Sequence, residues 1–168
     1  MKNLIRLCTF ALALTALPAF AQWDWSSTGS TGIVDDGTAS LGLYQFTGPL
    51  FAVRNDSIAE VEARYPVTNT MGSSTDISPA WTTLQMAYAD NSATAGSVVA
   101  SLYEVDICSS TETLLCSITS NDGDGTIECS TCTFSGPLDF ANKAYYVDVT
   151  VTKTDTPAAP GLYELAIY

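Results

Sequence analysis

The stretch that decides the fold is Ala144-Tyr145-Tyr146-Val147-Asp148-Val149-Thr150-Val151-Thr152-Lys153. Apolar and polar side chains alternate along it. One parity holds Tyr145, Val147, Val149 and Val151, and the other holds Tyr146, Asp148, Thr150 and Thr152. Alternation with a period of two is typical of a β-strand that buries one face, and β-branched residues favour strands. The stretch therefore predicts a long strand whose first set of side chains faces the core.

Shorter alternating or apolar runs lie on both sides of this strand. They cover residues 43–46, 50–53, 61–67, 84–88, 99–107, 114–119, 126–134 and 163–167. The inward set of 99–107 is predicted to be Val99, Tyr103, Val105 and Ile107, and that of the last run Tyr163, Leu165 and Ile167. No window has apolar residues at i, i+3, i+4 and i+7, so no helix is expected.

About eight or nine short strands with frequent turn residues predict an all-β fold: a single antiparallel β-sandwich, jelly-roll or Ig-like, stabilised by disulfides. The sandwich domain is predicted to span residues 43–168. Residues 22–42 are rich in Ser, Thr and Gly, and they predict either a loosely ordered leader or an irregular first edge.

The N-terminus has the features of a signal peptide. A basic start, Met1–Arg6, precedes the apolar run Leu7–Leu17, and Ala19-Phe20-Ala21 supplies small residues two apart. An apolar run of about 11 residues is too short to span a bilayer. We therefore expect residues 1–21 to be cleaved and Gln22–Tyr168 to be secreted, with the periplasm as the alternative compartment.

The charge balance excludes several classes of protein. The whole chain has 18 acidic and 6 basic residues and no histidine. The mature chain keeps four cations against all 18 carboxylates, a net charge of −14. Nucleic-acid binding needs a basic face, so it is not expected, and neither is membrane insertion. This charge suits neutral glycans, divalent cations or cationic partners.

Four cysteines remain in the mature chain: Cys108, Cys116, Cys129 and Cys132. In an oxidising compartment an even number predicts structural disulfides. The favoured connectivity is sequential, Cys108–Cys116 and Cys129–Cys132, because the first pair flanks a hairpin-sized connection. The competing connectivity is nested, Cys116–Cys129 and Cys108–Cys132, around a turn at Asp122-Gly123.

A glycine-rich acidic turn is a candidate calcium site. Asn121, Asp122 and Asp124 lie in it, and Glu128 follows closely. Calcium binds six to eight oxygen ligands, which such loops can supply. The alternative is a hairpin turn, since Asp-Gly is preferred in type I′ turns. Asp35-Asp36-Gly37 is a weaker second candidate for calcium.

Four aromatic residues are candidates for ligand binding, because the strand patterns do not bury them: Trp23, Trp25, Trp81 and Tyr146. Exposed aromatic rings beside carboxylates can stack on the C–H faces of sugars. The structural alternative is that Trp81 covers a sheet edge, that Tyr146 pairs across strands, and that the N-terminal tryptophans dock onto the sandwich.

Catalytic residues are hard to identify in this sequence. Paired carboxylates can hydrolyse glycosides without histidine, but no spacing singles out a pair. We therefore expect a non-catalytic module that binds a cell-surface or matrix component, with glycans as its ligands. The alternatives are a self-associating structural subunit and a carboxylate-dependent glycoside hydrolase. Residues 101–168 resemble bacterial secreted β-sandwich proteins in general appearance, which implies only fold and export.

Overall fold

The computed structural model describes residues 25–69, 78–92, 94–121 and 123–168. The predicted signal peptide, residues 1–21, and the candidate residues Trp23 and Asp122 lie outside these ranges. None of the helices in the described part of the chain has the length and apolar character needed to cross a membrane.

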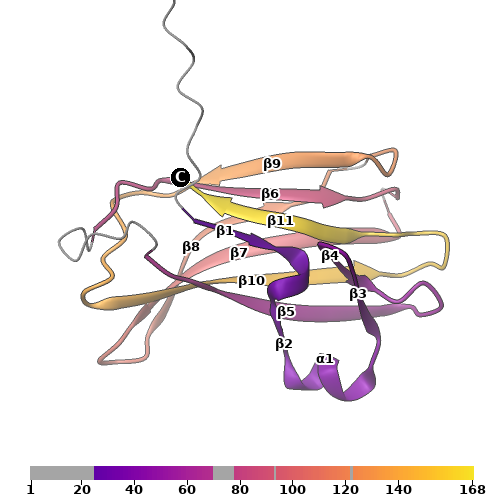
Figure 1. Ribbon diagram of the computed structural model, residues 1–168, viewed down its shortest axis with the longest axis horizontal. Coiled ribbons are helices and arrows are strands. Elements are labelled where there is room, and N and C mark those ends of the chain that lie inside the picture. The colour runs from indigo at the N-terminus through magenta and orange to yellow at the C-terminus, as the bar shows by residue number, and fades with distance from the viewer. Residues whose placement is uncertain (1–24, 70–77, 93, 122) are drawn as a thin grey trace, which may run out of the picture.

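The described strands form two antiparallel sheets packed as layers (Figure 1). The first sheet has the order β3-β4-β11-β6-β9, and β1 also pairs with β11. Its strands are β1 (Trp25–Thr28), β3 (Tyr44–Thr47), β4 (Leu50–Val53), β6 (Thr83–Ala89), β9 (Ile127–Thr133) and β11 (Gly161–Ile167). The predicted antiparallel β-sandwich is thus confirmed.

The second sheet has the order β2-β5-β10-β7-β8. Its strands are β2 (Ile33–Val34), β5 (Ala59–Val67), β7 (Gly96–Asp106), β8 (Glu112–Thr119) and β10 (Lys143–Lys153). The central strand, β10, is the one that the alternation identified first. Its residues Val147, Val149 and Val151 are 0% exposed. They pack in the core between the sheets, as predicted.

The predicted inward face of β7 is wrong. Val98, Ala100 and Leu102 are fully buried, whereas Val99, Tyr103 and Val105 are partly exposed on the outer face and Ile107 lies beyond the strand. Both parities of this strand carry apolar residues, so alternation could not decide between them. Pairing with β10 decides, because it sets Leu102 opposite the buried Val147.

The last strand also differs from its predicted pattern. The register of β11 against β6 shifts between Leu162 and Glu164. This irregularity places Leu162 in the core with Leu165 and Ile167, and leaves Tyr163 partly exposed. A bulge inserts one residue and reverses the parity that follows it, which a strict alternation rule misses.

The N-terminal segment forms the irregular edge that was one of its two predicted alternatives. β1 pairs with β11 and β2 pairs with β5, with the short 3-10 helix η1 (Gly29–Thr31) between them. A helix, α1 (Asp36–Leu41), follows and corrects the expectation of no helix. Capping residues at both ends explain this helix. At its N-terminus the Asp35 side chain accepts a hydrogen bond from the N–H of Gly37 at 2.8 Å, and at its C-terminus Gly42 adopts the left-handed conformation, φ 61°.

Candidate functional site

The aromatic residues predicted as an exposed platform are buried. Trp25 is 5% exposed, Trp81 2% and Tyr146 9%, while Trp23 lies outside the described residues. Trp25 lies opposite Ile167 on the inner face of the first sheet, and Trp81 packs edge-on against Phe140 in the core. The platform prediction is therefore wrong for these three residues, because tertiary contacts cover positions that the strand patterns left open.

Tyr146 is buried differently, on the outer face of the second sheet. Its ring stacks on that of the cross-strand neighbour Tyr103, with centroids 5.2 Å apart and planes 20° apart. The guanidinium carbon of Arg64 lies 4.2 Å from the centroid of the Tyr146 ring. Burial raises the pKa of Tyr146 to about 12. The ring is thus enclosed by its neighbours, and it makes a cation–π contact with Arg64.

Arg64 also pairs with Asp148, its direct partner across β5 and β10. Arg64 Nε lies 3.7 Å from Asp148 Oδ1. Burial raises the pKa of Asp148 above its usual value, and Arg64 offsets part of that rise. The pKa of Glu62, on the same face, is raised by burial and then by the Asp148 charge. Both carboxyl groups are therefore partly withdrawn from water.

These side chains line a groove of about 220 Å³ at the β2 edge of the second sheet, which we call the acidic groove. Its lining residues are Ile33, Val34, Asp35, Asp36, Glu62, Arg64 and Asp148. Carboxylates accept hydrogen bonds, Arg64 donates them, and Ile33 presents an apolar side chain that is 64% exposed. The groove can therefore bind a ligand that has hydroxyl groups and apolar C–H faces.

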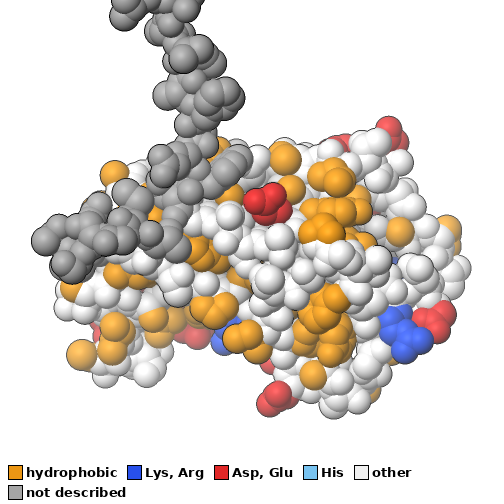
Figure 2. Space-filling model, viewed as in Figure 1, with side chains coloured by type: hydrophobic (Ala, Val, Ile, Leu, Met, Phe, Trp, Pro, Cys, Tyr) orange, Lys and Arg blue, Asp and Glu red, His pale blue; other side chains and the backbone are white. Residues whose placement is uncertain are grey.

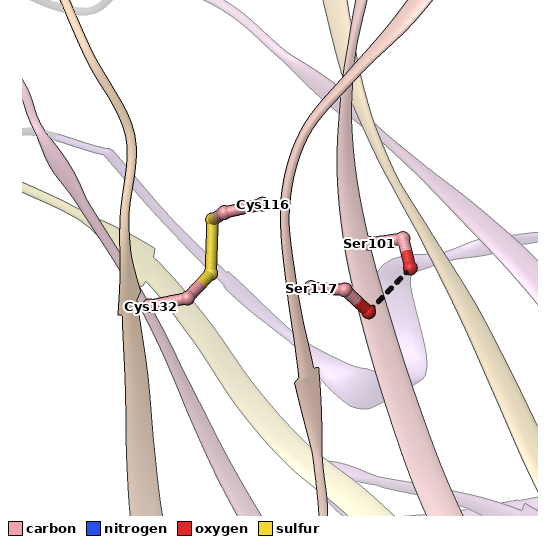
Figure 3. Close-up of a disulfide and its surroundings, with 4 residues drawn as sticks. All are labelled: Ser101, Cys116, Ser117 and Cys132. Carbon is pink, nitrogen blue, oxygen red and sulfur yellow. Dashed lines mark hydrogen bonds between the residues drawn. A yellow bond between two sulfur atoms is a disulfide. The ribbon is translucent and has the colours of Figure 1, made fainter.

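A row of side chains continues from the acidic groove across the second sheet. The register places Ile33, Arg64, Asp148, Ser101 and Ser117 side by side on five successive strands. The hydroxyls of Ser101 and Ser117 lie 2.9 Å apart (Figure 3). The outer face thus has a polar track that leads away from the groove.

Sequence reasoning found only part of this site. Asp35 and Asp36 were flagged for calcium, and Tyr146 for stacking. Asp148 belongs to the outward set of its strand, but no sequence pattern singles out Asp148, Glu62 or Arg64. The signal was available in their shared outward parity, but only the pairing of β5 with β10 places Arg64 beside Asp148.

The disulfide differs from both predicted connectivities. Cys116 bonds to Cys132, while Cys108 and Cys129 are free and exposed. Figure 3 shows the bond joining β8 to β9, with Cys116 and Ser117 on opposite sides of β8. The bond therefore links an edge strand of one sheet to an edge strand of the other.

The topology explains why the predicted pairs fail. Cys129 and Cys132 are three residues apart in one strand, so their side chains point to opposite faces. Cys108 lies in the β7–β8 turn, whereas Cys116 lies opposite Leu102. The nested pattern needed a hairpin between β8 and β9, but these strands belong to different sheets. The connection between β8 and β9 therefore does not join hairpin partners.

The described residues of the candidate calcium loop bind neighbouring protein groups. The N–H of Asn121 donates to the Tyr88 hydroxyl, which donates to Glu128 at 3.4 Å. Asp124 accepts from Thr126, which lowers its pKa. Asp122 lies outside the described ranges, and no three Asp, Glu, Cys or His side chains gather as a metal site among the residues within them. Calcium binding remains a prediction.

We expect calcium to raise the melting temperature of the mature chain, and a chelator to reverse this, if the Asn121–Glu128 loop binds the ion. An ion that binds only the folded state stabilises that state by mass action. Differential scanning calorimetry with calcium and with EGTA tests this, and Asp124→Asn should abolish the difference. Identical melting curves would leave these residues as turn residues.

A scan against protein-family models finds no match, and a search of the curated proteins finds none either. The solved structures that match include that of TmCBM61 in complex with beta-1,4-galactotriose. It is 13% identical to this chain, with 89% of each chain covered and a TM-score of 0.44. The two sheets and the groove of this chain define its class. It is an antiparallel β-sandwich with a polar groove on one outer face.

Proposed function

We propose that the exported mature chain is a non-catalytic binding module that holds a neutral glycan in the acidic groove. The observation that supports this most directly is the composition of the groove. Carboxylate acceptors, the donor Arg64 and the exposed apolar side chain of Ile33 meet in about 220 Å³. Sugar rings combine hydroxyl donors and acceptors with apolar C–H faces, so they match each of these groups.

The contacts of Arg64 support the proposal. The guanidinium lies against the Tyr146 ring and beside the Asp148 carboxylate, so the donor is positioned next to the acceptors of the groove and remains half exposed to a ligand. A groove of this size is smaller than the usual range for drug-sized ligands, so it fits about one sugar unit. Further units of a glycan would lie along the track of Ser101 and Ser117.

The proposal is tested by affinity gel electrophoresis of the mature chain in neutral polysaccharides built from glucose, galactose, mannose or xylose. Arg64→Ala and Asp148→Asn should each weaken binding about tenfold or more, because hydrogen bonds to charged groups contribute more than neutral ones. Glu164→Gln is the matched control. It removes one carboxylate from an exposed position on the first sheet and should leave binding unchanged.

Two further readouts separate this proposal from its alternatives. A neutral glycan should bind almost equally at low and high salt, whereas a cationic ligand would bind much more weakly at high salt. The polysaccharide that binds should also release no new reducing ends on prolonged incubation. If the chain binds none of the polysaccharides in the panel, the glycan proposal is refuted. If the bound polysaccharide releases reducing ends, the non-catalytic role is refuted.

We expect glycan binding to weaken as the pH falls through the raised pKa values of Glu62 and Asp148. The ionised carboxylates are the hydrogen-bond acceptors, so protonation removes acceptor capacity. Because burial raises both pKa values, the weakening should begin at a higher pH than for exposed carboxyl groups. Titration calorimetry across the acidic range measures this, and Asp148→Asn should flatten part of the profile. A flat profile for the unsubstituted chain would contradict it.

A further inference from the structure

The edge of the first sheet at β9 has unpaired backbone groups. The N–H of Phe134 donates to the carbonyl of Thr82 at 2.9 Å, and this bond fixes the positions of the hydrogen-bonded pairs between β9 and β6. Such pairs alternate along an antiparallel ladder, so Glu128, Ser130 and Cys132 also direct their backbone groups to β6. The outward positions are Ile127, Cys129, Thr131 and Thr133. Within the described residues, no backbone partner reaches the groups at these positions.

This edge also lacks the features that usually prevent pairing with another strand. Exposed edges are normally short, or they carry proline, lysine or a bulge. β9 has seven residues, no proline, no lysine and a continuous register against β6. By contrast, β2 has two residues, β3 has four, and the register of β8 is interrupted. β9 is therefore the described edge best suited to strand addition.

We propose that β9 pairs antiparallel with β9 of a second copy of this chain, about a two-fold axis at Cys129. In this register Ile127 lies opposite Thr131 of the second copy, and both are outward positions that can exchange backbone hydrogen bonds. Glu128 lies opposite Ser130, so no like charges face each other. The two Cys129 residues become direct partners, at a Cα separation of about 5.5 Å that a disulfide can span.

The charge distribution along β9 permits two copies to pair. Figure 2 shows few acidic side chains over the visible part of the first sheet, and Glu128 is the one acidic residue of β9. The net charge of the chain still opposes association, so salt should strengthen it. The acidic groove lies at the β2 edge of the other sheet, so pairing leaves it open in both copies. The inference does not depend on the proposed function.

The first experiment measures the mass of the mature chain against concentration by sedimentation equilibrium. A dimer should appear with rising concentration, and more readily at high salt. Thr131→Pro should weaken it about tenfold or more, because it removes one outward N–H donor from each copy. Thr119→Pro is the matched control on the β8 edge. Its N–H also points outward, since Ser120 donates to Val98 at 2.8 Å in the adjacent pair.

A second variant separates loss of the dimer from misfolding caused by proline. Thr131→Glu keeps the backbone N–H but adds to the net negative charge that opposes association, so it should weaken the dimer without loss of the fold. Circular dichroism and melting curves check the fold of both substitutions. A chain that stays monomeric at every concentration would overturn the proposal, and so would a dimer that is equally strong in folded Thr131→Pro and Thr131→Glu chains.

The register is tested by trapping with diamide, a diazene oxidant. Two thiols form one disulfide, and their two electrons and two protons convert diamide to its hydrazine. With Cys108→Ser, which leaves Cys129, covalent dimer should form about tenfold or more faster than with Cys129→Ser, because pairing raises the effective thiol concentration. The second variant keeps the exposed Cys108 and reports random collisions. Equal rates, or faster trapping through Cys108, would overturn the proposed pairing.

Discussion

Replacing Trp81 by alanine is expected to lower the free energy of unfolding by about 3 to 5 kcal/mol, the usual cost of truncating a buried tryptophan. The side chain is 2% exposed and is the largest that is fully buried among the described residues. Its ring meets Phe140 edge-on at 5.9 Å, and Phe140 in turn meets Tyr145 at 5.0 Å. Removing the indole would leave a cavity in the core beside Phe140.

Urea denaturation followed by circular dichroism measures this loss as a lower midpoint at an unchanged slope. Trp81→Phe should cost less, about 1 to 2 kcal/mol, because it keeps the aromatic contact and removes a buried N–H. That N–H has no hydrogen-bond partner among the described residues. Leu114→Ala, at a position 51% exposed, should change stability little. A stable Trp81→Ala chain that had lost glycan binding would instead restore the interpretation of Trp81 as a ligand platform.

Replacing Cys116 and Cys132 together by alanine is expected to cost about 3 kcal/mol, the chain-entropy value for a closed loop of about 15 residues. The bond spans a sequence separation of 16. It also joins β8 and β9, which no backbone ladder connects. Without it, the unfolded chain gains conformational freedom and the two sheet edges lose their covalent link.

The matched control is Cys108→Ala with Cys129→Ala, which removes two exposed thiols and should leave the unfolding midpoint nearly unchanged. Peptide mapping under non-reducing conditions should recover Cys116 bonded to Cys132. A map that shows Cys108–Cys116 or Cys129–Cys132, or a control pair that destabilises the chain as strongly, would contradict this connectivity.

The errors of sequence reasoning here have a common cause. In 99–107 both parities are apolar, so the face that packs depends on which residues of β10 lie opposite. The buried tryptophans follow the same rule, because Trp25 is the first residue of β1 and Trp81 precedes β6, and alternation says little at such positions. The disulfide could not be inferred from spacing, because adjacent β8 and β9 enter different sheets. Each case depends on contacts between segments distant in sequence.

The candidate site divides in the same way. The outward parity of Glu62, Arg64 and Asp148 is visible in the alternation of their strands, and so is the polar character of that face. Their meeting in one groove depends on the pairing of β2 with β5 and of β5 with β10. The enclosure of Tyr146 by Tyr103 and Arg64 needs three strands in register.

Local alternation was therefore sufficient for the fold class, for most strand positions and for the buried faces of β5 and β10, because period-two burial is a property of each strand alone. The order of the strands, the disulfide partners, the burial of the aromatic residues and the composition of the acidic groove were decided only by the tertiary structure. These features arise from register and from packing between the sheets, and both join residues that the chain keeps far apart.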